Sequence, residues 1–180
     1  RRFTDQDASK FNFINNAYGS DIIHLGVHGI GDQEIADNSR LIFRRDSLND
    51  AELYSYEIYN LKLNAGLVVL SACESGIGRS QAGEGMFSIA RAFTYAGCPS
   101  LVMSLWQVRD TFTSEIMIAF YESLNRQVPV SSSLRNAKLK FLRESDAYSA
   151  HPANWAAFVV TGQDLSFEKE SSYPFWIYLI

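Results

Sequence analysis

Four continuous apolar runs constrain the fold of this chain most strongly. They cover residues 21–29, 67–73, 100–106 and 155–162. These runs lack the polar alternation of a half-exposed strand, so they are typical of strands that are buried on both faces. We therefore expect a sheet that other elements cover on both sides.

Helical patterns lie between the apolar runs. Apolar residues recur at helical spacing over residues 83–96, 113–124 and 132–142. Gly97, which precedes Cys98 and Pro99, is expected to end the first helix. Ser131 or Ser132 is the expected N-cap of the third. Strands that alternate with helices predict an α/β fold with a mostly parallel sheet and helices on both faces.

Composition narrows the class of protein. The chain has 180 residues, 47% of them hydrophobic, and a net charge of −4. This is the composition of one globular domain, and it excludes intrinsic disorder. The negative charge argues against non-specific nucleic-acid binding, which needs a basic surface. Two cysteines fit a reducing compartment, so a cytoplasmic location is expected.

The last residues form a separate apolar tail. We expect the globular domain to cover residues 1–165 and the tail to cover residues 166–180. The apolar stretch 173–180 is shorter than the roughly 20 residues that cross a membrane. It is interpreted either as a last strand or packed terminus, or as the start of a truncated transmembrane helix that would anchor the protein.

Three of the expected strands end in residues that can carry chemistry. His28 and Cys73 lie at the ends of the first and second apolar runs, and Asp110 follows the third. Ligands of such sheets bind beyond the carboxyl ends of the strands, so these residues are expected on one rim. A thiol at a strand end is a candidate nucleophile, and a histidine is the side chain best suited to accept its proton. The alternative for Cys73 is a small buried filler.

His24 lies four residues before His28 and is therefore expected on the same face of one strand. Its deeper position suggests a buried histidine with satisfied hydrogen bonds. No second Cys or acidic residue at a ligand spacing supports a zinc site with His24, His28 and Cys73. No metal or cofactor is expected.

The order of motifs along the chain resembles that of the CHAT domain, a caspase-like module often found with TPR repeats. The matching stretches lie at residues 24–29, 67–76, 83–85, 91–93, 96–97, 104–108, 120–121 and 151–158. Together they reach from about Ile22 to Gly162. The resemblance implies a caspase-like three-layer sandwich, related to separases, gingipains and caspases.

The family's catalytic pair falls on His28 and Cys73. A His followed about 50 residues later by a Cys is also the caspase order. The resemblance implies that His28 accepts the thiol proton and that the Cys73 thiolate attacks a peptide carbonyl. The backbone N–H groups of Gly29 and Cys73 are the expected oxyanion donors.

Asp110 resembles the separase residue that lines the pocket for a basic side chain before the scissile bond. A carboxylate there would select Arg by bidentate hydrogen bonds. Ser71 and Trp106 are the other expected residues of this pocket, although Trp106 also suits a core position. The alternative for Asp110 is a helix N-cap, and Arg109 beside it is a candidate to neutralise its charge.

The sequence thus predicts a cysteine endopeptidase that cleaves a protein substrate and is regulated by upstream TPR or sensor segments. The polar loops 31–37 and 76–85 are candidate activation elements. The alternative is a catalytically silent CHAT-like signalling or interaction module. A hydrolase on another α/β fold is disfavoured, because the chain has no Gly-x-Ser-x-Gly elbow.

Overall fold

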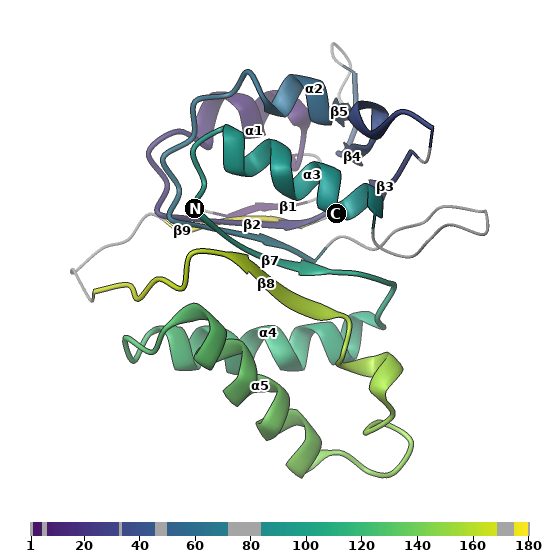
Figure 1. Ribbon diagram of the computed structural model, residues 1–180, viewed down its shortest axis with the longest axis vertical. Helices are drawn as coiled ribbons and strands as arrows, with labels where there is room; N and C mark the ends of the chain where they lie inside the picture. Colours follow the sequence, from purple (N-terminus) through teal and green to yellow (C-terminus); the bar gives the residue numbers. More distant parts are fainter. Residues whose placement is uncertain are drawn as a thin grey trace.

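The computed structural model describes residues 2–4, 7–32, 34–45, 50–71, 84–168 and 175–179. Within these ranges a six-stranded sheet lies between two layers of helices (Figure 1). Its strands run in the order β1-β9-β2-β6-β7-β8. Their bounds are β1 Arg2–Thr4, β9 Phe175–Leu179, β2 Ile22–Gly26, β6 Leu67–Leu70, β7 Ser100–Ser104 and β8 Phe158–Gly162.

The sheet is parallel except at one edge, where β8 pairs antiparallel with β7. The four apolar runs form β2, β6, β7 and β8. Every residue of β6 and of β7 is buried, as expected for strands that are covered on both faces. The predicted α/β class with a mostly parallel sheet and three layers is confirmed.

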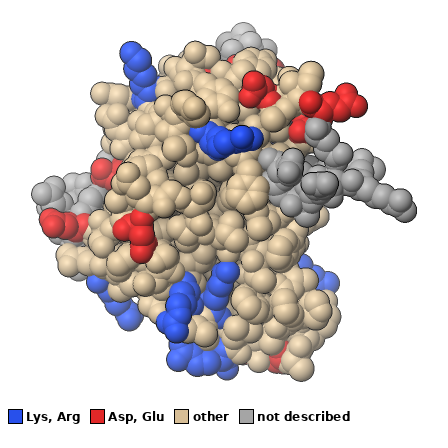
Figure 2. Space-filling model, viewed as in Figure 1, with Lys and Arg blue, Asp and Glu red and all other residues tan. Residues whose placement is uncertain are grey.

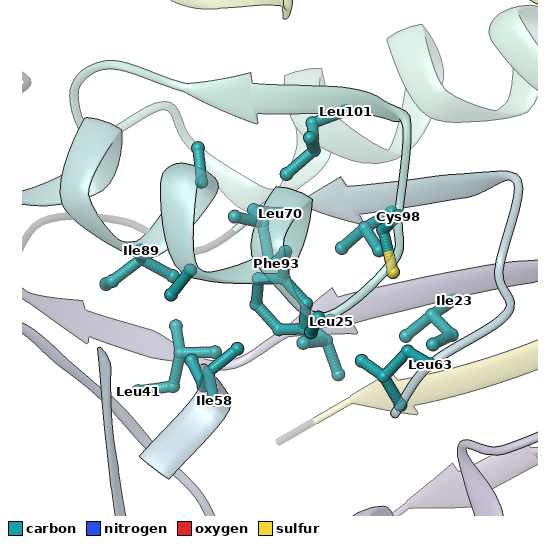
Figure 3. Packing of buried hydrophobic residues seen from close by; sticks show 14 of the residues in the cluster. Ile23, Leu25, Leu41, Ile58, Leu63, Leu70, Ile89, Phe93, Cys98 and Leu101 are labelled. Carbon is teal, nitrogen blue, oxygen red and sulfur yellow. The ribbon is translucent and has the colours of Figure 1, made fainter. Parts of the chain in front are cut away.

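One layer of helices contains α1 Lys10–Asn16, α2 Ser55–Ile58 and α3 Glu84–Tyr95. Phe13, Ile58 and Phe93 from these helices join Ile23 and Leu25 of β2 in one buried cluster. Figure 3 shows Phe93 among the aliphatic side chains of this core. The helix α3 ends as predicted, because Gly97 follows it with a φ of 105°, a conformation that favours glycine.

The opposite layer contains α4 Asp110–Leu124 and α5 Val130–Glu144. Their apolar side chains pack with Val69 and Val102 in a second buried cluster. Lys and Arg side chains gather over this layer in Figure 2, so charge is unevenly distributed over a chain whose net charge is −4.

The helix α5 begins two residues earlier than predicted. Its N-cap is Pro129, so the expected N-cap at Ser131 or Ser132 is wrong. The carboxylate of Asp164 instead accepts hydrogen bonds from the backbone N–H and the hydroxyl of Ser131, at 2.8 and 2.7 Å. A residue distant in sequence therefore satisfies an N–H in the first turn.

The first apolar run does not continue as one strand. It bends at Val27, and His28 begins β3 His28–Ile30, which belongs to a second sheet. This antiparallel sheet contains β3, β4 Arg40–Ile42 and β5 Glu52–Tyr54. The expectation that His24 and His28 share one strand is therefore wrong. Short one-turn helices η2 Ala36–Asn38 and η3 Pro152–Asn154 complete the described elements.

Residues 175–179 of the apolar tail form the strand β9, which pairs with β1 on one side and β2 on the other. Of the two interpretations of this tail, residues 175–179 match that of a strand. No helix in the described ranges is long and apolar enough to cross a membrane.

Candidate active site

A cavity of about 660 Å³ opens at the carboxyl end of the sheet, between the strand ends and α4. This volume lies within the usual range of ligand pockets. One face of α4 forms a wall along the whole length of the helix. The lining residues are His24, Gly26, Val27, His28, Ser71, Asp110, Thr113, Ser114, Met117, Ile118, Tyr121, Glu122 and Asn125.

His28 reaches this cavity from the first position of β3, where its side chain is exposed. β3 pairs with β4, so His28 lies opposite Ile42 and Gly29 lies opposite Leu41. The bend at Val27 therefore moves His28 out of the six-stranded sheet and leaves its imidazole open to a ligand. Gly29 is buried in β3.

The predicted nucleophile Cys73 lies outside the described residues, and so does its backbone N–H. The described chain reaches Ser71, which follows β6 and lines the cavity. The structure brings His28 and Asp110, two of the three strand-end residues, to one cavity together with Ser71.

Asp110 is the first residue of α4, and its carboxylate lines the cavity. The N-cap of this helix is Arg109, so the alternative role of Asp110 as N-cap is wrong. The Arg109 guanidinium lies 5.8 Å from the ring centroid of Tyr148. Among the described residues no ion pair joins Arg109 to Asp110, so Arg109 does not neutralise the carboxylate.

The charged residues that line the cavity favour a cation. Asp110 and Glu122 contribute carboxylates, and no Lys or Arg is among the lining residues that the structure describes. Glu122 pairs with Lys140 at 3.0 Å. Asp110 has no such ion pair in the described part of the chain, so its charge is not compensated by a described residue.

His24 lies at the inner end of the cavity with both ring nitrogens engaged. Its Nε2 is 2.9 Å from the Ser71 hydroxyl, and its Nδ1 is 2.9 Å from the Tyr121 hydroxyl. His24 is 6% exposed, and burial lowers its pKa from 6.5 to about 4. The ring is therefore neutral near pH 7. The expectation of a buried histidine with satisfied hydrogen bonds is confirmed.

The partners of His24 were not predicted from the sequence. Burial also raises the pKa of the Tyr121 hydroxyl, which therefore stays protonated. The helical pattern placed Tyr121 among apolar residues of α4. A buried tyrosine hydroxyl requires a hydrogen-bond partner. This requirement is the one feature of the sequence that indicated a role for Tyr121 besides packing.

Trp106 does not line the cavity. Its indole Nε1 donates to the carbonyl of Ala153 at 2.9 Å, and its ring packs against the second core cluster. The structure therefore does not place Trp106 with Ser71 and Asp110. Its location matches the alternative of a core residue.

The second cysteine, Cys98, is fully buried in the first core cluster, beside Ile23 and Leu63 (Figure 3). Burial raises the pKa of its thiol to about 12. This agrees with the expectation that Cys98 fills space in the core. No group of three or more His, Cys, Asp or Glu side chains in the described ranges could hold a metal ion.

Comparison with known families decides the assignment of this fold. The model of the CHAT domain family matches residues 1–163. The chain belongs to the CHAT domain family. The predicted resemblance is confirmed, and the three-layer arrangement is the caspase-like fold that it implied.

Two curated relatives of this CHAT domain carry the name Tetratricopeptide repeat protein 28. The Mus musculus protein is 35% identical over 125 residues, which are 69% of this chain. The Homo sapiens protein is 31% identical over 140 residues, which are 78% of this chain. The matches cover only 5% and 6% of these relatives. The association of CHAT domains with TPR proteins is therefore present among the relatives.

Proposed function

We propose that this CHAT domain is a cysteine endopeptidase that uses His28 and Cys73. The observation that carries the proposal is the cavity shared by His28 and Ser71. His28 is exposed to it, and the chain continues from Ser71 to Cys73 within two residues. A thiol delivered there would lie at the carboxyl end of the sheet, where such folds bind their ligands.

The proposed reaction is acyl transfer through the Cys73 sulfur. His28 accepts the thiol proton, and the thiolate attacks the scissile carbonyl. The backbone N–H groups of Gly29 and Cys73 are the proposed donors to the oxyanion. The amine product leaves with a proton from His28, and water then hydrolyses the thioester. No metal or cofactor takes part in this sequence.

We propose that the cavity accepts a basic side chain of the protein substrate. Asp110 supports this preference, because its carboxylate lines the cavity without an ion pair among the described residues. A charge-assisted hydrogen bond to a guanidinium is among the strongest contacts that a carboxylate can make. Ser71 supplies a second oxygen in the same lining.

Regulation by an upstream TPR or sensor segment is also a proposal, supported by the names of the two relatives. Of the candidate activation loops, 76–85 falls mainly outside the described residues. In 31–37, the Asp32 carboxylate accepts hydrogen bonds from the N–H groups of Glu34 and Ile35 at 3.0 and 2.9 Å. These contacts tie Asp32 to the backbone of Glu34 and Ile35.

The test is cleavage of a diverse peptide library by the domain and by the longest chain that contains it. We expect cleavage by the wild type and none by Cys73→Ala. His28→Ala should abolish it as well, because the thiol then lacks its proton acceptor. Cleavage that persists in Cys73→Ala would reject the proposal.

The alternative hypothesis is a catalytically silent interaction module. It predicts no peptide cleavage by the domain or by the longer chain that contains it. It also predicts no preferential reaction of Cys73 with iodoacetamide. If Cys73 reacts preferentially with iodoacetamide but no peptide in the library is cleaved, the thiolate is populated and an activating segment is needed.

A further inference from the structure

Three side chains that line the cavity form a continuous hydrogen-bonded chain. Tyr121 of α4 lies 2.9 Å from Nδ1 of His24, and Nε2 of His24 lies 2.9 Å from Oγ of Ser71. The rings of His24 and Tyr121 are 5.7 Å apart between centroids. His24 and Ser71 are brought together because β2 and β6 are neighbouring parallel strands.

The hydroxyl hydrogen of Ser71 has a partner inside the protein in either tautomer of His24. Ser71 Oγ also lies 3.5 Å from the carbonyl oxygen of Leu25. If Nε2 carries the proton, it donates to Ser71, and Ser71 donates to the Leu25 carbonyl. If Nε2 is bare, Ser71 donates to it directly. A neutral imidazole has one donor and one acceptor, and a hydroxyl has one hydrogen and two lone pairs.

Both tautomers of His24 leave the Ser71 oxygen available to a ligand as a hydrogen-bond acceptor. The hydrogen of Ser71 is used internally, and at least one lone pair of its oxygen remains unused by the His24 contact. Such an oxygen accepts hydrogen bonds from a ligand and offers no hydrogen of its own. It suits ammonium and guanidinium groups, which are donors without an acceptor.

We propose that His24 and Tyr121 are positioning residues that fix Ser71 Oγ as a hydrogen-bond acceptor for a cationic side chain. This deepens the proposed function, since it gives the basic pocket a second determinant beside Asp110. It also assigns His24 a role in specificity rather than in proton transfer. Arg and Lys share the donor chemistry, so the two must be distinguished by separate probes.

Binding of small cations tests the proposal without any cleavage. The probes are agmatine for guanidinium, butylamine for ammonium, and butylurea as a neutral control. Each is titrated by NMR into folded Cys73→Ala protein, which cannot turn over substrate. We expect saturable binding of one or both cations at the cavity and weaker binding of butylurea.

Two substitutions distinguish the role of the acceptor Ser71 from that of the positioning residue Tyr121. Ser71→Ala should weaken cation binding about tenfold, which corresponds to about 1.4 kcal/mol. Tyr121→Phe keeps the ring and removes the hydroxyl, so it should weaken binding several-fold by loosening His24. Ser71→Thr retains the hydroxyl and should restore most of the affinity. Circular dichroism and melting temperature identify any variant that does not fold.

Equal cation affinities for the Cys73→Ala protein with and without Ser71→Ala or Tyr121→Phe would overturn the proposal, even if stability changed. Absence of saturable cation binding to the folded protein would overturn it too. The proposed protease function fails separately, when peptide cleavage survives Cys73→Ala, or when cleavage is absent and Cys73 does not react preferentially with iodoacetamide. Ser71-dependent cation binding with neither cleavage nor preferential alkylation of Cys73 would keep this inference and reject the enzyme.

Discussion

Gly85 in the first turn of α3 lies directly against the backbone of Gly31, which follows the strand that carries His28. A Cβ atom at Gly85 would lie 2.1 Å from the Cα of Gly31. No side chain fits there, so the two backbones are in contact. This contact joins α3, which follows the Cys73 segment in the chain, to the strand of His28.

Substitution Gly85→Ala should therefore separate α3 from the loop after β3. We expect a loss of about 1–3 kcal/mol in the free energy of unfolding, the usual cost of overpacking a filled site. Urea unfolding measures it. Arg91→Ala, at an exposed position of the same helix, is the control and should change stability by less than about 0.5 kcal/mol. Equal effects of the two substitutions would contradict the close contact.

The buried His24 should make stability depend on pH. Its pKa in the folded protein is about 4 against an ordinary value of 6.5, so between these values the unfolded chain binds more protons. Stability is then fully present above about pH 6.5 and falls as the pH drops toward 4. The loss amounts to up to about 3 kcal/mol.

Urea unfolding between pH 7 and pH 4.5 measures this dependence. The variant His24→Gln does not titrate there and should show a shallower loss of stability over the same range. Comparing the two removes the contribution of the other ionisable groups. Parallel pH profiles would mean that His24 is not buried as a neutral ring.

The two cysteines should react very differently with iodoacetamide. The pKa of Cys98 is raised to about 12 by burial, so almost no thiolate is present near neutral pH. If Cys73 is the nucleophile, it should account for nearly all labelling of the native protein. Mass spectrometry of digested protein gives both rates. Native Cys73→Ala should stay unlabelled until denaturant exposes Cys98, and rapid native labelling of Cys98 would contradict its burial.

Asp110→Asn should reduce selectivity for basic residues if the domain cleaves peptides. The change removes the charge and nearly preserves the shape, so the ratio of kcat/KM for an Arg peptide over a Met peptide should fall about tenfold or more. Glu115→Gln removes an exposed carboxylate of the same helix that does not line the cavity. The ratio of kcat/KM for the Glu115→Gln variant should match that of the wild type. An Arg preference that survives Asp110→Asn would exclude Asp110 from the pocket.

Local patterns in the sequence were sufficient for the layers of the fold. The apolar runs of β2, β6, β7 and β8 report burial on both faces, and the helical spacing of α3 and α4 reports one buried face each. The order of strand ends also predicted His28, Cys73 and Asp110 at one edge, because parallel strands bring their carboxyl ends together. His28 and Asp110 do line one cavity. The family assignment rested on the same stretches.

Only the tertiary structure decided how these residues are arranged. The bend at Val27 transfers His28 to a second sheet, and the short strands β4 and β5 gave no pattern by which to foresee that sheet. Ser71 and Tyr121 meet at His24 from separate elements, and Asp164 supports the first turn of α5 from beyond β8. The periodicity of apolar residues indicates which side chains are buried. It does not indicate which residues distant in sequence form hydrogen bonds, because these pairs form only where packing brings the two elements together.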